Sequence, residues 1–107
     1  MKPWRGVLLA AAGLLGAMPL AVQAGETVEV VIQKYSFQPQ ELRIKAGDSI
    51  RWVNREKRQF HSVLFSGQAE SDYLFPGDAF VKDFPAPGVY PYHCGPHPEM
   101  TGTVHVD

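Results

Sequence analysis

Apolar and polar residues alternate in short segments along most of the chain after residue 24, and stretches that contain Gly and Pro separate these segments. Such alternation is typical of strands that are buried on one face. The expected strands are residues 28–32, 42–45, 49–53, 61–65, 79–84, 89–93 and 101–106. Turns are expected at Ala46-Gly47-Asp48 and at Pro85-Ala86-Pro87-Gly88. Seven or so short strands with no helical pattern predict an all-β fold, an antiparallel β-sandwich.

Residues 66–77 give a weaker pattern. They carry several turn-forming residues and few apolar ones before Tyr73-Leu74-Phe75, so we expect a loop with an edge strand or a single turn. The aromatic cluster at Tyr73 and Phe75 is expected to pack in the core. Trp52, which lies between Ile50 and Val53, is expected there too.

Residues 1–24 have the pattern of a secretory signal peptide. Lys2 and Arg5 form a charged start, an apolar stretch follows, and Val22-Gln23-Ala24 fits a small-residue cleavage site. An uncleaved anchor is the alternative interpretation. Cleavage after Ala24 leaves residues 25–107 as one small domain, located in the periplasm, with no further segment to insert into a membrane.

An exported chain with a single cysteine cannot form an internal disulfide, so Cys94 needs another role. Metal ligation is the first expectation and intermolecular pairing the second. Without Lys2 and Arg5, eight basic and eleven acidic residues remain, a formal net charge of −3. This balance gives no reason to expect nucleic acid or anionic lipid as a partner.

The segment Cys94-Gly95-Pro96-His97-Pro98-Glu99-Met100 places a thiol, an imidazole and a thioether in one short loop. With His61 upstream, they form a His₂Cys set and a weak Met donor, which is the ligand set of a mononuclear blue-copper electron-transfer site. The prolines restrict the backbone of the loop and so favour a rigid site. A lone cysteine is also commonly a small buried hydrophobe, and a methionine near a terminus commonly fills the core. The joint occurrence of the four residues favours metal binding over these interpretations.

The chain resembles the cupredoxins, the type 1 blue copper proteins, and within them the amicyanin and plastocyanin families. The likeness covers nearly all of residues 25–107. The matching segments are Lys34-Tyr35, Pro39-Gln40-Glu41-Leu42, Ala46-Gly47-Asp48, Trp52-Val53-Asn54-Arg55-Glu56, His61, Pro87-Gly88-Val89-Tyr90, Tyr92-His93-Cys94, Pro96-His97-Pro98 and Met100. The short gaps on both sides of His97 match amicyanin better than plastocyanin.

This resemblance implies a Greek-key sandwich of seven to eight strands that binds one type 1 copper ion. It also implies His61, Cys94 and His97 as equatorial ligands and Met100 as the axial ligand, with the far edge of His97 as the electron port. His93 and His105 are expected not to bind the metal. The implied function is that of a monomeric periplasmic electron carrier, not an enzyme. Its donor and acceptor would be redox proteins, such as a dehydrogenase or a c-type cytochrome.

Two residues depart from the family pattern. Ser62 replaces the usual Asn beside the first ligand, so the hydrogen bond that ties the ligand loops together is expected to be weaker or rerouted. Glu99 replaces an apolar residue of the ligand loop. Copper delivery or buffering is the alternative function. It is less consistent with a chain in which Met100 is the only methionine after residue 24.

Overall fold

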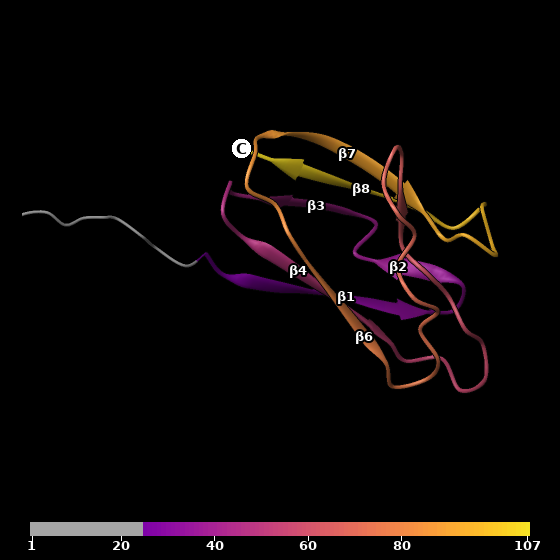
Figure 1. Ribbon diagram of the computed structural model, residues 1–107. Helices are drawn as coiled ribbons and strands as arrows, with labels where there is room; N and C mark the ends of the chain where they lie inside the picture. Colours follow the sequence, from indigo (N-terminus) through magenta and orange to yellow (C-terminus); the bar gives the residue numbers. More distant parts are fainter. Residues whose placement is uncertain (1–24) are drawn as a thin grey trace, which may run out of the picture.

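The computed structural model describes residues 25–107, so the expectations for residues 1–24 lie outside the described part of the chain. Those residues form eight strands in two layers (Figure 1). The strands are β1 Thr27–Gln33, β2 Ser36–Gln38, β3 Glu41–Ile44, β4 Ser49–Asn54, β5 Leu64–Phe65, β6 Ala79–Asp83, β7 Gly88–His93 and β8 Thr101–Val106. One sheet has the order β2-β1-β4-β6 and the other the order β3-β8-β7-β5. This confirms the predicted all-β sandwich of seven to eight strands.

The expectation of a wholly antiparallel sandwich is corrected, because both sheets are mixed. β1 pairs with β4 in parallel, and β3 pairs with β8 in parallel. The chain leaves the first sheet after β2, adds β3 to the second sheet and then returns as β4 alongside β1. Alternation shows which face of a strand is buried, but it carries no information about the direction of the neighbouring strand.

The hairpin between β1 and β2 was not predicted. Its two loop residues, Lys34 and Tyr35, have φ angles of 56° and 52°. Two-residue hairpins with positive φ at both positions usually carry Asn and Gly, which adopt this conformation easily. Because Lys and Tyr give no such signal, the turn cannot be recognised from the local sequence.

The expected strand 61–65 is also shorter than predicted. Only Leu64–Phe65 forms β5, and His61 makes an isolated bridge with Leu74 across the loop that follows. Residues 25–107 contain no candidate membrane-spanning helix.

Trp52 forms the centre of the core, as expected, and is fully buried. It packs edge-on against Tyr92 and Phe65. The indole Nε1–H donates a hydrogen bond of 3.1 Å to the hydroxyl of Tyr92, so a polar contact joins β4 of one sheet to β7 of the other. Burial raises the pKa of Tyr92 to about 12.

Candidate metal centre

Three of the predicted ligands come together at one end of the sandwich. His61 lies in the connection between β4 and β5, where its backbone exchanges hydrogen bonds of 3.1 and 2.7 Å with Leu74. Cys94 follows directly after β7, and His97 lies in the loop that leads to β8. That loop is closed by the Cys94 amide, which donates to the Met100 carbonyl at 3.0 Å, and by the Met100 amide, which donates to the His97 carbonyl at 2.9 Å.

The donor atoms of these three residues surround a space of the size of a metal ion. The Nδ1 atoms of His61 and His97 are 3.2 Å apart, and Sγ of Cys94 lies 3.7 Å and 3.6 Å from them, respectively. A point equidistant from these atoms lies about 2 Å from each, close to the usual metal–nitrogen and metal–sulfur bond lengths of about 2.0–2.3 Å. The three residues therefore fit a single transition-metal ion. Among the described residues, they form the group of His, Cys, Asp or Glu side chains whose ligand atoms lie close enough together to hold a metal ion.

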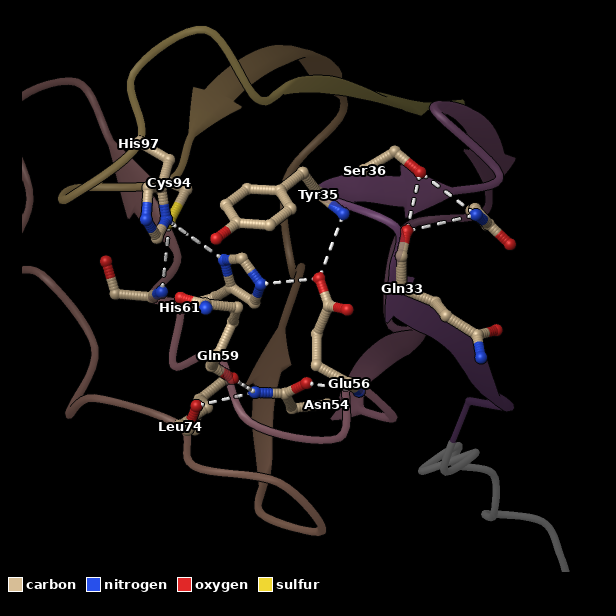
Figure 2. A network of polar contacts seen from close by, with 12 residues as sticks. Gln33, Tyr35, Ser36, Asn54, Glu56, Gln59, His61, Leu74, Cys94 and His97 are labelled. Atoms are coloured by element: carbon tan, nitrogen blue, oxygen red, sulfur yellow. Dashed lines mark hydrogen bonds and ion pairs between the residues drawn. The ribbon is translucent and has the colours of Figure 1, made fainter.

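Glu56 fixes the orientation of the first histidine. Its Oε2 atom lies 2.9 Å from Nε2 of His61 and accepts a second hydrogen bond of 2.9 Å from the amide of Tyr35 (Figure 2). When Nε2 carries the proton and donates it to the carboxylate, Nδ1 presents a free lone pair to the other donors. Carboxylate contacts of this kind orient metal-binding histidines and make them better ligands.

Buried Asn54 holds the segment that carries Glu56 and His61. Its Nδ2 atom donates to the carbonyls of Gln59 at 2.8 Å and Leu74 at 2.7 Å, and its Oδ1 atom accepts from the amide of Glu56 at 2.8 Å. This one side chain therefore makes hydrogen bonds to the chain before and after His61 (Figure 2). These bonds restrict the movement of the segment.

Cys94 is fully buried, and the amide of Ser62 donates to its sulfur at 3.3 Å. Burial raises the pKa of the Cys94 thiol, although the backbone amides of Ser62 and His97 oppose the shift. A buried thiolate therefore needs a cation beside it, which a metal ion supplies. The burial also argues against the alternative of a disulfide to a second chain.

Comparison with known proteins shows the family to which this chain belongs. The sequence profile of the cupredoxin-like domain matches residues 6–106. The chain belongs to the cupredoxin-like family. It is 42% identical to amicyanin-alpha of Methylorubrum extorquens over 91% of this chain and 84% of that protein. It is 34% identical to amicyanin of Paracoccus denitrificans over 78% of this chain and 68% of that protein.

Solved structures place this cupredoxin in the same group. A methionine-to-alanine mutant of amicyanin, solved in the Cu(I) state, aligns with a TM-score of 0.72 and 31% identity. The alignment covers 76% of this chain and 82% of that one. The predicted resemblance to the amicyanin and plastocyanin type is thereby confirmed.

Met100, the predicted axial ligand, is buried at the end of the ligand loop with 3% of its surface exposed. Its backbone bonds to Cys94 and His97 place it beside the three donors. Its role as a ligand remains a prediction.

The other histidines lie outside the donor group, as expected. His93 is half-buried between the inward-facing Tyr92 and Cys94. His105 is on β8 at the surface, where its Nε2 atom lies 3.1 Å from Oε1 of Glu41.

The surface around His97 is aromatic. His97 is half-buried, and the ring of Tyr35 packs edge-on against both His97 and His61, with centroid distances of 5.0 and 5.4 Å (Figure 2). Phe60 lies 6.3 Å from His97 by ring centroids. The half-exposed imidazole thus joins the buried donors to the protein surface.

The expectation that Tyr73 and Phe75 belong to the core is wrong. They are 48% and 53% exposed and pack on Phe60, with ring centroids 5.0 and 5.6 Å apart. Only Leu74 between them is buried, because it forms the bridge to His61 and successive side chains of an extended segment face opposite sides.

Sequence reasoning missed the site roles of Tyr35, Glu56 and Glu70. Tyr35 covers the two histidines, Glu56 orients His61, and Glu70 contacts Ser62. Tyr35 and Glu56 stand in segments that carry the family resemblance, but nothing in the local pattern assigns them a contact. Glu70 stands in an irregular loop and gave no signal.

Proposed function

We propose that the protein carries single electrons between redox proteins and that His61, Cys94, His97 and Met100 hold its one type 1 copper ion. The observation that carries this proposal is the triangle of two imidazole nitrogens and one buried thiol sulfur, with sides of 3.2 to 3.7 Å. Two histidines, a cysteine and a weak methionine donor are the ligand set of blue-copper sites. Bound copper supplies a one-electron couple between Cu(I) and Cu(II).

The protein is an electron carrier, not an enzyme. The residues around the proposed copper site suit electron transfer. His61 and Cys94 are fully buried and keep water from the site, while half-buried His97 gives a short path from the surface. The hydrogen bonds of Asn54 and Glu56 hold the first ligand in one orientation, so little has to move when the charge of the site changes.

The partners are redox proteins that donate and accept electrons, and we propose that they dock at the end of the sandwich that carries His97. Phe60, Tyr73 and Phe75 form an aromatic surface beside this histidine. A hollow nearby is lined by Lys34, Arg55, Lys57, Arg58 and three neighbouring residues. An apolar face with a basic rim suits a partner with an acidic rim, of which a dehydrogenase or a c-type cytochrome is an example. We further propose that the carrier acts as a monomer.

The proposed location is the periplasm. Residues 1–24 would direct export and be removed after Ala24, which would leave residues 25–107 as the cupredoxin domain. Mass spectrometry of the protein purified from a periplasmic extract tests this directly. The expected mass is that of a chain that starts at Gly25. A protein that keeps residues 1–24 and is found in the membrane fraction would contradict the proposal.

One experiment tests the metal site. The copper-free protein is titrated with Cu(II) and followed by absorption and electron paramagnetic resonance. An intense blue band that saturates at one copper per chain is expected, because a Cys94 thiolate bonded to Cu(II) gives a strong charge-transfer absorption. Cys94→Ser should bind copper without this colour, and a colourless Cu(II) adduct of the unchanged protein would overturn the assignment.

The same preparation separates an electron carrier from a copper-delivery protein. The blue protein is reduced with ascorbate and reoxidised with ferricyanide in repeated cycles, in the presence of a strong Cu(I) chelator. A carrier keeps its copper and recovers its full colour in each cycle. Stepwise transfer of Cu(I) to the chelator would favour delivery or buffering instead.

A further inference from the structure

Glu70 is a carboxylate in the loop between β5 and β6 that reaches the metal-ligand loops through one buried hydroxyl. Its Oε2 atom lies 2.6 Å from Oγ of Ser62, and the same Oγ lies 2.9 Å from the amide nitrogen of Gly95. Ser62 follows the ligand His61 and Gly95 follows the ligand Cys94. The three residues therefore connect the two segments that supply the metal donors.

Chemistry fixes the direction of both hydrogen bonds. The amide of Gly95 can only donate and an ionised carboxylate can only accept, so the Ser62 hydroxyl accepts from Gly95 and donates to Glu70. The O–H to carboxylate distance of 2.6 Å is typical of a charge-assisted hydrogen bond, which is stronger than a bond between neutral groups. Glu70 thus determines where the lone pairs of Ser62 point, and these lone pairs hold Gly95.

Gly95 leaves the space that Glu70 occupies. A Cβ atom at position 95 would overlap Oε2 of Glu70 and would lie 2.9 Å from Oγ of Ser62. The absence of a side chain after Cys94 is therefore coupled to the presence of the carboxylate. Both belong to one arrangement together with Ser62, the residue that departs from the family pattern.

The backbone keeps Glu70 opposite Ser62. The next residue in each segment forms a two-way link, because the Ser71 amide donates to the Val63 carbonyl at 3.0 Å and the Val63 amide donates to Oγ of Ser71 at 2.9 Å. The contact between Glu70 and Ser62 thus lies beside two hydrogen bonds that join the same two segments, although Glu70 itself is on an exposed loop.

We propose that Glu70 is a positioning residue that acts through Ser62 on Cys94 and lowers the reduction potential of the copper site. The carboxylate orients the Ser62 hydroxyl, which ties Gly95 to the His61 segment, while the Ser62 amide donates to the Cys94 sulfur. Its negative charge also stabilises the oxidised site more than the reduced one, because Cu(II) carries one more positive charge. This inference rests on the proposed copper site.

The first test replaces Glu70 by Gln, which has nearly the same shape and retains an oxygen that accepts from Ser62. The matched control is Asp72→Asn on the same loop, an exposed carboxylate whose side chain makes no hydrogen bond among those of the described residues. Glu70→Gln should keep the blue spectrum and raise the reduction potential clearly more than Asp72→Asn does. Equal shifts in the two variants would overturn the proposal, since a residue with a structural role alone would be replaced by Gln without a specific change in potential.

The second test removes the Glu70 carboxylate altogether and measures its energetic coupling to Gly95. Glu70→Ala frees the Ser62 hydroxyl, so we expect both a higher potential and a shifted charge-transfer band, and Glu70→Gln should restore the wild-type band. Gly95→Ala should destabilise the copper-free protein less in a Glu70→Ala background than in the wild type, as measured by denaturant unfolding. An unchanged spectrum in Glu70→Ala, or full additivity of the two substitutions, would overturn the proposal. If the wild-type protein itself is not blue, the proposed function fails instead.

Discussion

Oε2 of Glu56 lies 2.9 Å from Nε2 of His61, a proposed metal ligand. The Glu56 side chain is 12% exposed and that of His61 is fully buried. Burial alone would raise the pKa of Glu56. Hydrogen bonds from the Tyr35 amide, from His61 and from the Lys34 amide outweigh burial and lower the pKa below its ordinary value. The carboxylate therefore joins the tight turn after β1 to His61.

Glu56→Gln is predicted to weaken copper binding by about 10- to 100-fold, because loss of such an outer contact usually has an effect of this size on metal affinity. The amide can accept only with its oxygen, and the negative charge that strengthens the contact to His61 is lost. Competition with a Cu(II) chelator measures the change. Glu41→Gln is the control, since Glu41 contacts the surface histidine His105 and should have no effect on affinity. Equal affinities for all three proteins would contradict the prediction.

Met100 is predicted to set the potential without producing the colour. Its soft thioether favours Cu(I) relative to an oxygen donor, so Met100→Gln should lower the reduction potential and Met100→Leu should raise it. The blue band should persist in both variants because the Cys94 bond is unchanged. Cyclic voltammetry measures the shifts. If neither substitution moves the potential, Met100 is a core residue and not the axial ligand.

The basic residues beside His61 are predicted to attract anionic partners. Arg55, Lys57 and Arg58 are exposed and line one hollow together with Lys34. Oxidation of the reduced protein by ferricyanide, an anion, should slow as salt rises, because ions screen the attraction over about 10 Å at 0.1 M. Stopped-flow kinetics gives the salt slope.

Lys57→Gln and Arg58→Gln should flatten that slope while the spectrum stays unchanged. Lys45→Gln is the matched control, because Lys45 is exposed at the opposite end of the sandwich, in the turn before β4. A salt slope that responds equally to all three substitutions would show that only the net charge of the protein affects the rate and that Lys57 and Arg58 have no specific steering role.

Tyr92→Phe is predicted to reduce the free energy of unfolding by about 1–3 kcal/mol, because it leaves the buried Nε1–H of Trp52 without a partner. Urea unfolding of the copper-free protein measures this loss. Tyr90→Phe is the control, since the Tyr90 hydroxyl donates to the carbonyl of Ala86 near the surface and should cost less.

The same residue predicts an alkaline limit of stability. The pKa of Tyr92 is raised to about 12 in the folded protein, and the ordinary value for tyrosine is about 10. The neutral phenol therefore contributes its full stability below pH 10, and this contribution is lost as pH rises from about 10 towards 12. Tyr92→Phe should lack this part of the decline, and parallel curves for the two proteins would contradict the assignment.

Much of the fold could be predicted from the sequence because its strands carry a local signal. Residues 49–53, which alternate clearly, lie within β4 Ser49–Asn54, and the spacing of Cys94 and His97 indicated donors that the structure brings together. The β1–β2 hairpin could not be predicted, because Lys34 and Tyr35 adopt positive φ without a turn-forming residue.

The hydrogen bonds that hold the proposed ligands in place could not be predicted either, since they join segments that are distant in the sequence. Glu56 is 21 positions from the amide of Tyr35 that it binds, and Ser62 is 33 positions from Gly95. A local pattern reports the face on which a side chain lies but not the partner that it meets there. The parallel strand pairs in the two sheets could not be predicted for the same reason.

The hydrogen bond between Trp52 and Tyr92 has a consequence for register. Tyr92 and Cys94 both face inward, and His93 between them faces the other side. A slip of β7 by one residue would turn Cys94 towards solvent and His93 into the core. It would also break the bond to Trp52, so a mispaired strand would bury an unsatisfied indole N–H and lose the thiol at the same time. The hydrogen bond between Trp52 and Tyr92 therefore favours the register of β7 in which Cys94 faces the proposed copper site.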